Sequence, residues 1–318
     1  MTLHLTRLCN HYVLQLGDRL LSSSGNPRDP IANKNLFYVC RDAIVAIGYT
    51  GIAYGLAPQR PTLPTDQWIA EKLWGGDFPD LGERPGFLRV RRIDNFRDIG
   101  LSVRSLCESL DEAFENLPAA NRKLPFELGI GGYKQDRRKQ MIPIWLRIGR
   151  KHAGSRFEVT EKLERYSHLE CKKIVYDLPR GYLPSGDSDK ILEGLSSEHI
   201  DTSEKVLVET VREVSKYNSN IVGPHCVSIL IFPDLRVRVR FLPLVPHRAR
   251  FASQSRKFED AFPVAFSPWL IGPGGYSAPS LFSGTWQWQS GGPVNVVVEG
   301  PEPHGNRFSL SSQRRFRP

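Results

Sequence analysis

Residues 2–19 read TLHLTRLCNHYVLQLGDR and begin a series of short strands. Val, Leu and Tyr dominate residues 3–8 and 12–16, and a polar turn separates the two runs. Two further apolar runs, residues 36–40 and 43–47, are separated only by Arg41-Asp42, as in a hairpin turn. The first fifty residues therefore predict antiparallel strands that return the chain to one end of a sheet.

Helices interrupt this series of strands. The first is expected at residues 65–74, where Thr65 can cap the first amide groups. A second carries apolar side chains at spacings of three and four over residues 103–117 and ends at Pro118. These two helices are amphipathic, so we expect each to cover one face of a sheet.

A third amphipathic helix is expected at about residues 203–217, capped by Asp201 with Glu204 in its first turn. Strands surround it in the sequence, at residues 126–131, 141–148, 157–163, 226–232 and 235–242. This order of elements predicts an α+β fold in which helices cover the outer faces of two packed sheets.

The composition changes after Pro243, where Pro, Gly, Ser and Trp cluster. One more strand is expected at residues 294–298. We therefore predict two parts, a main domain at residues 2–244 and a C-terminal appendage of turns and short strands at residues 245–318. The tryptophans of this appendage argue against a disordered tail.

Three polar residues of the first part are candidates for chemistry. Removal of Met1 would make Thr2 the first residue, and Asp18 and Lys34 follow at equal spacings of sixteen residues. An N-terminal threonine combines a nucleophilic hydroxyl with its own base, because the α-amino group, with a pKa near 8, can take the proton. A buried lysine favours the neutral amine, and an aspartate keeps that lysine charged.

In this spacing the chain resembles the proteasome β-subunits and the related bacterial ring peptidase, which are N-terminal-nucleophile hydrolases. The resemblance implies a four-layer αββα sandwich and a threonine-type amide hydrolase that forms an acyl-enzyme on Thr2. A peptide is the preferred substrate, and a small-molecule amide is the alternative. It also implies an oxyanion hole at a glycine N–H, for which Gly51 is preferred and Gly48 is the alternative. Ser185, in the loop Leu183-Pro-Ser-Gly-Asp-Ser188, matches a supporting serine.

The sequence departs from the family pattern after the last helix. Ser219 and Val222 stand where the family has aspartate and serine, although Gly223 matches. This departure keeps a second interpretation open, in which the same fold is a catalytically inert assembly or binding protein. The resemblance covers about residues 2–242 and is most specific in the first fifty.

The composition bounds the remaining possibilities. The formal charge is +9, but no nucleic-acid motif accompanies it, and the alternating stretch at residues 236–240 suits a strand with one solvated face. Five scattered cysteines without a C-x-x-C pair argue against a disulfide framework or zinc site and favour a reduced, cytoplasmic compartment. No run of apolar residues is long enough to predict a membrane span. The resemblance implies self-association, in a ring or another homo-oligomer, and no cofactor, and the sequence does not tell whether an unfoldase partners the chain.

Two histidines of the first hairpin, His4 and His11, alternate with apolar residues. One of them could face a cleft, but an exposed or hydrogen-bonded strand histidine is the simpler interpretation. Cys9 and Cys40 have no histidine partner in the sequence and are expected in the core.

Overall fold

The computed structural model describes residues 3–23, 26–29, 34–75, 97–164, 174–178, 199–242, 269–272, 275–277, 284–288 and 292–299. Within them lie the helices α1 (Thr65–Trp74), α2 (Ile99–Glu115), α3 (Ala119–Arg122) and α5 (Ile200–Tyr217). The strands up to α5 are β1 (His4–Leu8), β2 (Val13–Asp18), β3 (Leu21–Ser23), β4 (Asn26–Asp29), β5 (Asn35–Val39), β6 (Ala43–Thr50), β7 (Glu127–Gln135), β8 (Met141–Gly149), β9 (Glu158–Glu164) and β10 (Ile174–Leu178). Those after it are β11 (Cys226–Ile231), β12 (Arg236–Leu242), β13 (Trp269–Gly272), β14 (Gly275–Ser277), β15 (Gly284–Trp288) and β16 (Gly292–Glu299).

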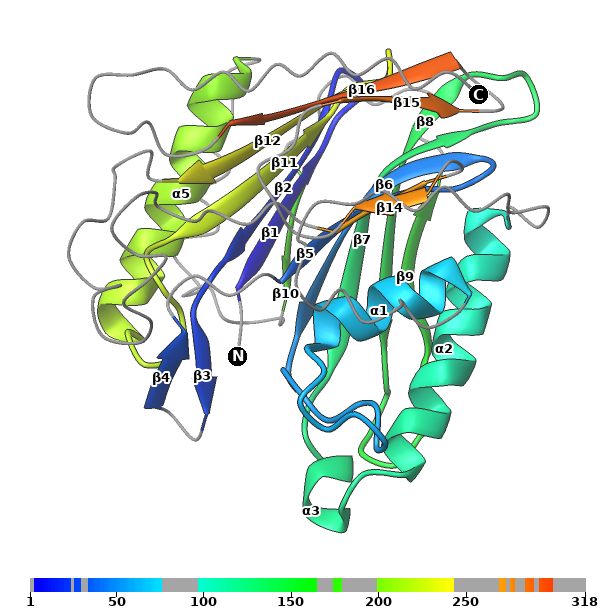
Figure 1. Cartoon of the computed structure of the whole chain (residues 1–318). Helices are drawn as coiled ribbons and strands as arrows, with labels where there is room; N and C mark the ends of the chain where they lie inside the picture. The colour runs from blue at the N-terminus through cyan, green and yellow to red at the C-terminus, as the bar shows by residue number, and fades with distance from the viewer. Residues whose placement is uncertain are drawn as a thin grey trace, which may run out of the picture.

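Two seven-stranded sheets dominate the fold (Figure 1). The first sheet has the order β10-β1-β2-β11-β12-β16-β15, and the second has the order β14-β13-β5-β6-β7-β8-β9. Most neighbouring strands are antiparallel, but β16 runs parallel to β12 and β13 runs parallel to β5. The fold is thus mixed α/β with two sheets and few helices, in keeping with the α+β class predicted above.

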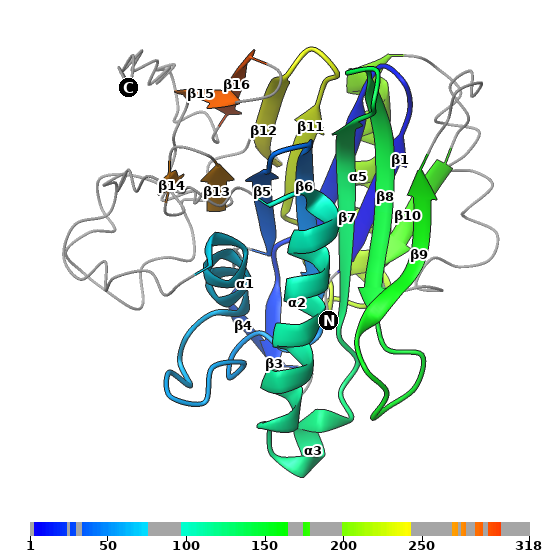
Figure 2. The same cartoon turned by 90° about the vertical axis from the view of Figure 1, so that its right-hand side faces the viewer.

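Three apolar clusters follow from the alternation of side chains along the strands. One cluster contains side chains of both sheets, with Val13, Ile229 and Val239 from the first and Phe37 and Trp145 from the second. A second cluster joins the other face of the second sheet to α1 and α2, and a third joins the other face of the first sheet to α5. Figure 2, turned from Figure 1, shows α1 and α2 in front of the second sheet and α5 behind the first. Most central strands are therefore buried on both faces.

The two predicted helix caps are wrong in detail. Pro64, not Thr65, occupies the N-cap of α1, and the Thr65 hydroxyl instead donates to the Ile52 carbonyl at 2.8 Å. The last helix begins at Ile200, three residues earlier than expected, with His199 at the N-cap. Asp201 therefore lies inside the first turn, where its side chain is free to face the arginines of β12.

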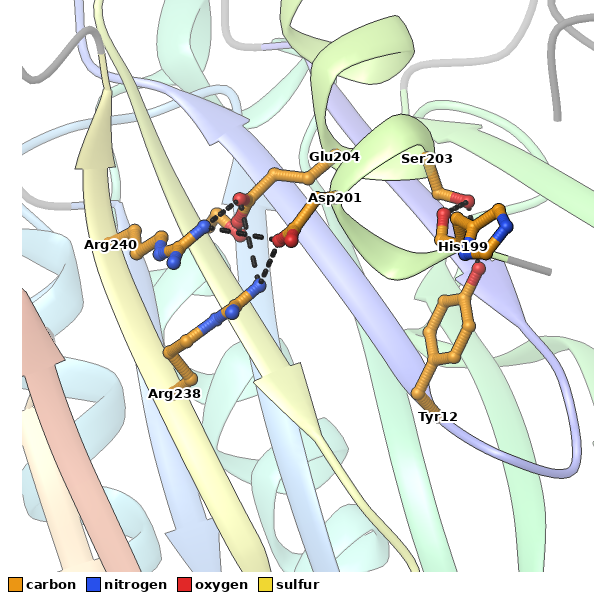
Figure 3. A network of polar contacts seen from close by, with 8 residues as sticks. Tyr12, His199, Asp201, Ser203, Glu204, Arg238 and Arg240 are labelled. Atoms are coloured by element: carbon orange, nitrogen blue, oxygen red, sulfur yellow. Dashed lines mark hydrogen bonds and ion pairs between the residues drawn. The ribbon is translucent and has the colours of Figure 1, made fainter. Parts of the chain in front are cut away.

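Those arginines explain part of the basic character of the chain. Arg240 donates to Glu204 at 2.8 Å and to Asp201 at 3.4 Å, and Arg238 lies 3.3 Å from Asp201 (Figure 3). Ser228 of β11 also bonds the buried Glu204 carboxylate. Arg238 and Arg240 of β12 therefore hold the start of α5 against the sheet. These two positive charges have partners within the protein and require no nucleic acid.

The four described C-terminal strands extend both main sheets. β13 continues the second sheet from the β5 side, and β16, followed by β15, continues the first sheet from the β12 side. The strand predicted at residues 294–298 corresponds to the longer β16. Strands from beyond residue 244 thus share sheets with the first part of the chain. The division of the chain into two domains at residue 244 stays a prediction.

One close approach in the second sheet gives a stability prediction. A Cβ at Gly132 of β7 would lie 2.1 Å from the Ile44 carbonyl oxygen and 2.6 Å from the Val45 Cα, both backbone atoms of β6. We expect Gly132→Ala to lower the free energy of unfolding by about 3 kcal/mol, because backbone cannot move aside as a flexible side chain can. Gly100→Ala is the control, since nothing lies within 4 Å there and alanine favours α2, so a gain of about 0.5 kcal/mol is expected. Denaturant titration measures both, and equal midpoints for Gly132→Ala and the unaltered protein would contradict the argument.

Candidate active site

A buried ion pair lies at the end of the first sheet. Asp18 is the last residue of β2, and Lys34 directly precedes β5 of the second sheet. Lys34 Nζ lies 3.5 Å from Asp18 Oδ2, and both side chains are almost completely shielded from solvent. The structure thus brings together two of the three residues on which the sequence-based hypothesis depends.

The Asp18 carboxylate joins four separate segments of the chain. It accepts hydrogen bonds from the backbone N–H groups of Leu3 at 2.7 Å, Leu20 at 3.0 Å and Gly223 at 3.1 Å. Lys34 Nζ in turn donates to the Leu20 carbonyl. Asp18 therefore fixes the N-terminal segment and the loop after α5 against the ammonium group of Lys34.

Electrostatics at this pair are dominated by burial. Removal from water raises the pKa of Asp18, while the charge of Lys34 and the three N–H donors act in the opposite direction. Every one of these contacts offers a proton to the carboxylate, so the arrangement suits the ionised form of Asp18. An ionised Asp18 is what would keep Lys34 charged without solvent.

His4 lies beside this pair and is completely buried. Its Nε2 is 3.0 Å from the Tyr49 carbonyl oxygen, and because a carbonyl only accepts, the proton belongs on Nε2. Burial, reinforced by the positive charge of Lys34, lowers the pKa of His4 to about 3. His4 is therefore a neutral imidazole, and its Nδ1 is an acceptor without a hydrogen-bond partner among the described residues.

The two candidate glycines for an oxyanion hole have different surroundings. Gly48, on β6, lies opposite Asn35, and a Cβ added to it would lie 2.4 Å from His4 Nδ1. Gly51 lies past the end of β6 with φ of +114°, and its Cβ would meet the Pro125 carbonyl oxygen at 2.3 Å. Gly48 therefore borders the His4 side of the site, whereas Gly51 packs against the segment that leads into β7.

The remaining predicted site residues divide into two groups. Thr2 and Ser185 lie outside the described residues, so their predicted roles stay predictions. Of the two departures from the family pattern, Ser219 is exposed, whereas Val222 is buried in the cluster between α5 and the first sheet. The glycine next to it, Gly223, supplies an N–H to Asp18 as described above.

Sequence reasoning missed two side chains of this region. The interpretation of His4 as an exposed or hydrogen-bonded strand histidine holds in part, because it is buried and bonds Tyr49 through Nε2, while its Nδ1 has no partner among the described residues; His11 is exposed. Asn35, the residue after Lys34, is also buried, and neither atom of its amide has a partner in the described part of the chain. For Asn35 the available signal was a polar residue at the head of an apolar strand, whereas β1 also carries Thr6 and Arg7, so His4 did not stand out.

Other reactive groups give no second site among the residues described. No three His, Cys, Asp or Glu side chains gather there as a metal site would require, and no helix there is long and apolar enough to cross a membrane. Cys9 and Cys40 are buried, as expected for core residues. Burial also raises the pKa of the Cys40 and Cys226 thiols, so neither is set up as a nucleophile.

Comparison with known proteins gives distant structural likeness only. No protein-family model matches the chain, and no curated protein matches it. Among solved structures, Anbu from Hyphomicrobium sp. strain MC1 is similar with a TM-score of 0.45 and 10% identity over 72% of this chain and 82% of that one. Anbu, the ancestral beta-subunit, from Yersinia bercovieri has a TM-score of 0.45 and 11% identity over 72% and 80%. Eukaryotic HslV from Trypanosoma brucei has a TM-score of 0.38 and 14% identity over 72% and 99%. Likeness at this level carries no inference about activity, and the function proposed below is argued from the site itself.

Proposed function

We propose that this protein is a threonine-type N-terminal-nucleophile amide hydrolase, directed at peptides, with Thr2 as its nucleophile after removal of Met1. The observation that carries the proposal is the buried Asp18–Lys34 pair, whose carboxylate bonds the N–H of Leu3, the residue after Thr2. An ion pair of this kind is costly to bury, and replacing it by apolar side chains is often neutral or stabilising. Its position against the N-terminal segment is the reason to assign it a chemical role.

The proposed mechanism uses the chain's own groups. The Thr2 hydroxyl attacks the amide carbonyl while the α-amino group takes its proton, and the same proton then goes to the leaving amine. The charge of Lys34 lowers the pKa of a nearby amine and so favours its neutral, basic form. Asp18 holds Lys34 charged, Ser185 supports the N-terminus, and water then releases the acyl group from Thr2.

A glycine N–H would bind the oxygen that becomes negative during attack. Gly48 lies in the middle of β6, paired with Asn35 of β5 on one side and with Gly129 of β7 on the other, so the ladder hydrogen bonds of the sheet use its N–H. Gly51 lies past the last residue of β6, outside both pairings, and its φ of +114° is one that glycine adopts readily. We therefore keep Gly51 as the preferred oxyanion donor within the proposal, with Gly48 as the alternative.

The rest of the family pattern belongs to the same proposal. It includes the αββα layering, division of the chain at residue 244, self-association into a ring or other homo-oligomer, and a cytoplasmic location. The apolar clusters on the helix-covered faces of both sheets support the layering. Sedimentation of the purified protein tests self-association.

One observation favours a second candidate, a catalytically inert assembly or binding protein. Val222 is fully buried where the family pattern has a serine, so no hydroxyl is available there to support the N-terminus. In this case the Asp18–Lys34 pair would serve stability alone.

Intact mass before and after incubation with an epoxyketone distinguishes the two candidates. Such probes react with a hydroxyl and a free α-amine on one residue. We expect loss of Met1 and a single adduct, which Thr2→Ala abolishes and which the control Thr202→Ala, an exposed change on α5, leaves intact. Retained Met1 with no adduct would exclude the catalytic function and leave the inert candidate.

A further inference from the structure

Two buried side chains beside Lys34, His4 and Asn35, have polar atoms without hydrogen-bond partners among the described residues. His4 Nδ1 and both amide atoms of Asn35 are buried and have no hydrogen bond among the described residues. Buried polar atoms are nearly always hydrogen-bonded in folded proteins, to protein or to ordered water. Two such side chains in one place therefore point to a ligand rather than to chance.

The geometry brings these atoms together. His4 comes from β1 of the first sheet and Asn35 from β5 of the second, and both lie against Gly17 of β2. The point that a Cβ of residue 17 would occupy lies 2.5 Å from His4 Nδ1 and 2.8 Å from Asn35 Nδ2. The two nitrogens are thus close enough for one small molecule to reach both. Only glycine at positions 17 and 48 leaves room for the imidazole in its present place.

The chemistry of the two groups selects the ligand. His4 Nδ1 is a fixed acceptor, because the proton is on Nε2, and the Asn35 amide can turn to present either its oxygen or its NH₂ group. Both groups are uncharged, and the positive charge of Lys34 acts on His4, so a metal cation is not favoured there. A neutral molecule that can donate two hydrogen bonds and accept others fits them, and water does so with the least volume.

We propose that His4 and Asn35 form a built site for one buried water molecule beside Lys34. The water donates one hydrogen to His4 Nδ1 and the other to Asn35 Oδ1. His4 and Asn35 are positioning residues in this arrangement, because they act on the reacting groups through the water.

The structural half of the proposal is tested without any assumption about function. A crystal structure at high resolution should show a water within about 3.2 Å of both His4 Nδ1 and the Asn35 amide. Asn35→Leu, which keeps the approximate shape of the side chain, should remove that water and lower the midpoint of unfolding. Absence of a shared water, or a higher midpoint for Asn35→Leu, would show that these atoms are orphaned and would overturn the site.

The functional half rests on the proposed hydrolase and uses two variants of one residue. His4→Gln places an amide near the position of Nε2, so it keeps the donor to Tyr49 but loses the acceptor at Nδ1. His4→Asn places an amide near the position of Nδ1, so it keeps an acceptor there but loses the donor to Tyr49. We expect kcat to fall roughly tenfold or more in His4→Gln with little change in KM, and to be largely retained in His4→Asn despite lower stability. Equal kcat in His4→Gln and the unaltered enzyme would overturn the role of the water. Failure of the Thr2 adduct in the unaltered protein would instead remove the proposed hydrolase, and the crystallographic test of the water would still stand.

Discussion

Asp18→Asn is expected to lower the free energy of unfolding by about 3–5 kcal/mol, among the largest effects of a single change in this chain. The substitution leaves the Lys34 ammonium buried without its counter-charge. It also turns an amide NH₂ toward groups that are themselves donors, the N–H of Leu20 and of Gly223 among them. Denaturant unfolding followed by circular dichroism at neutral pH measures the loss.

A second ion pair provides the matched control. Arg41 donates to Asp98 through two nitrogens, Nε and Nη2, but the two side chains are 54% and 34% exposed. Asp98→Asn should therefore cost less than about 1 kcal/mol. Adding Lys34→Met to Asp18→Asn should recover at least about 1 kcal/mol, because the unpaired charge is removed with its partner. Equal losses for Asp18→Asn and Asp98→Asn would mean that the pair is not buried in solution.

Acidification should destabilise the protein through His4. The folded state keeps this imidazole neutral down to pH about 3, whereas in the unfolded chain it gains a proton below its ordinary pKa of 6.5. The unfolded state therefore binds more protons between these values, and stability falls as pH falls, by at most about 1.4 kcal/mol per pH unit. From pH 6.5 to about pH 4 the His4 contribution is a loss of roughly 3 kcal/mol.

The comparison that isolates this effect is between the unaltered protein and His4→Gln. Asp18 acts in the opposite direction, because burial raises its pKa and the folded state then takes up that proton more readily than the unfolded chain. The free energy of unfolding is measured for both proteins at several pH values. Subtracting one curve from the other removes most of the contribution of Asp18, because both proteins contain it. His11→Gln, at an exposed position of the same hairpin, controls for the loss of a histidine. Parallel curves for His4→Gln and the unaltered protein would contradict the burial of His4.

Local patterns were sufficient for much of the fold. Alternating runs marked β1 and β2, continuous apolar runs marked β5 and β6, and the three- and four-residue spacing of apolar side chains marked α2 and α5. The start of α5 was misjudged because Asp201 is a common N-cap residue, whereas its partners Arg238 and Arg240 lie nearly forty positions away. No local rule contains that information.

The candidate site was also partly predictable from local patterns. Equal spacing along returning strands was enough to expect Asp18 beside Lys34. His4 could not be placed, because a polar residue on a strand normally indicates a solvated face, and here a second sheet covers that face. The preference for Gly51 over Gly48 depended on the neighbouring residues in the sequence, whereas the feature that distinguishes the two glycines is the pairing of Gly48 with strands on both sides.

The parallel pairings of β13 with β5 and of β16 with β12 have a consequence for synthesis of the chain. A ribosome that has made only the first 242 residues has produced two sheets whose β5 and β12 edges still lack their neighbours. Unpaired strand edges are templates for pairing with other chains, so the nascent protein passes through a stage that is prone to aggregation. Translation speed and chaperone supply over residues 243–299 should therefore govern the yield of native protein, even though the proposed nucleophile and the Asp18–Lys34 pair lie in the first fifty residues.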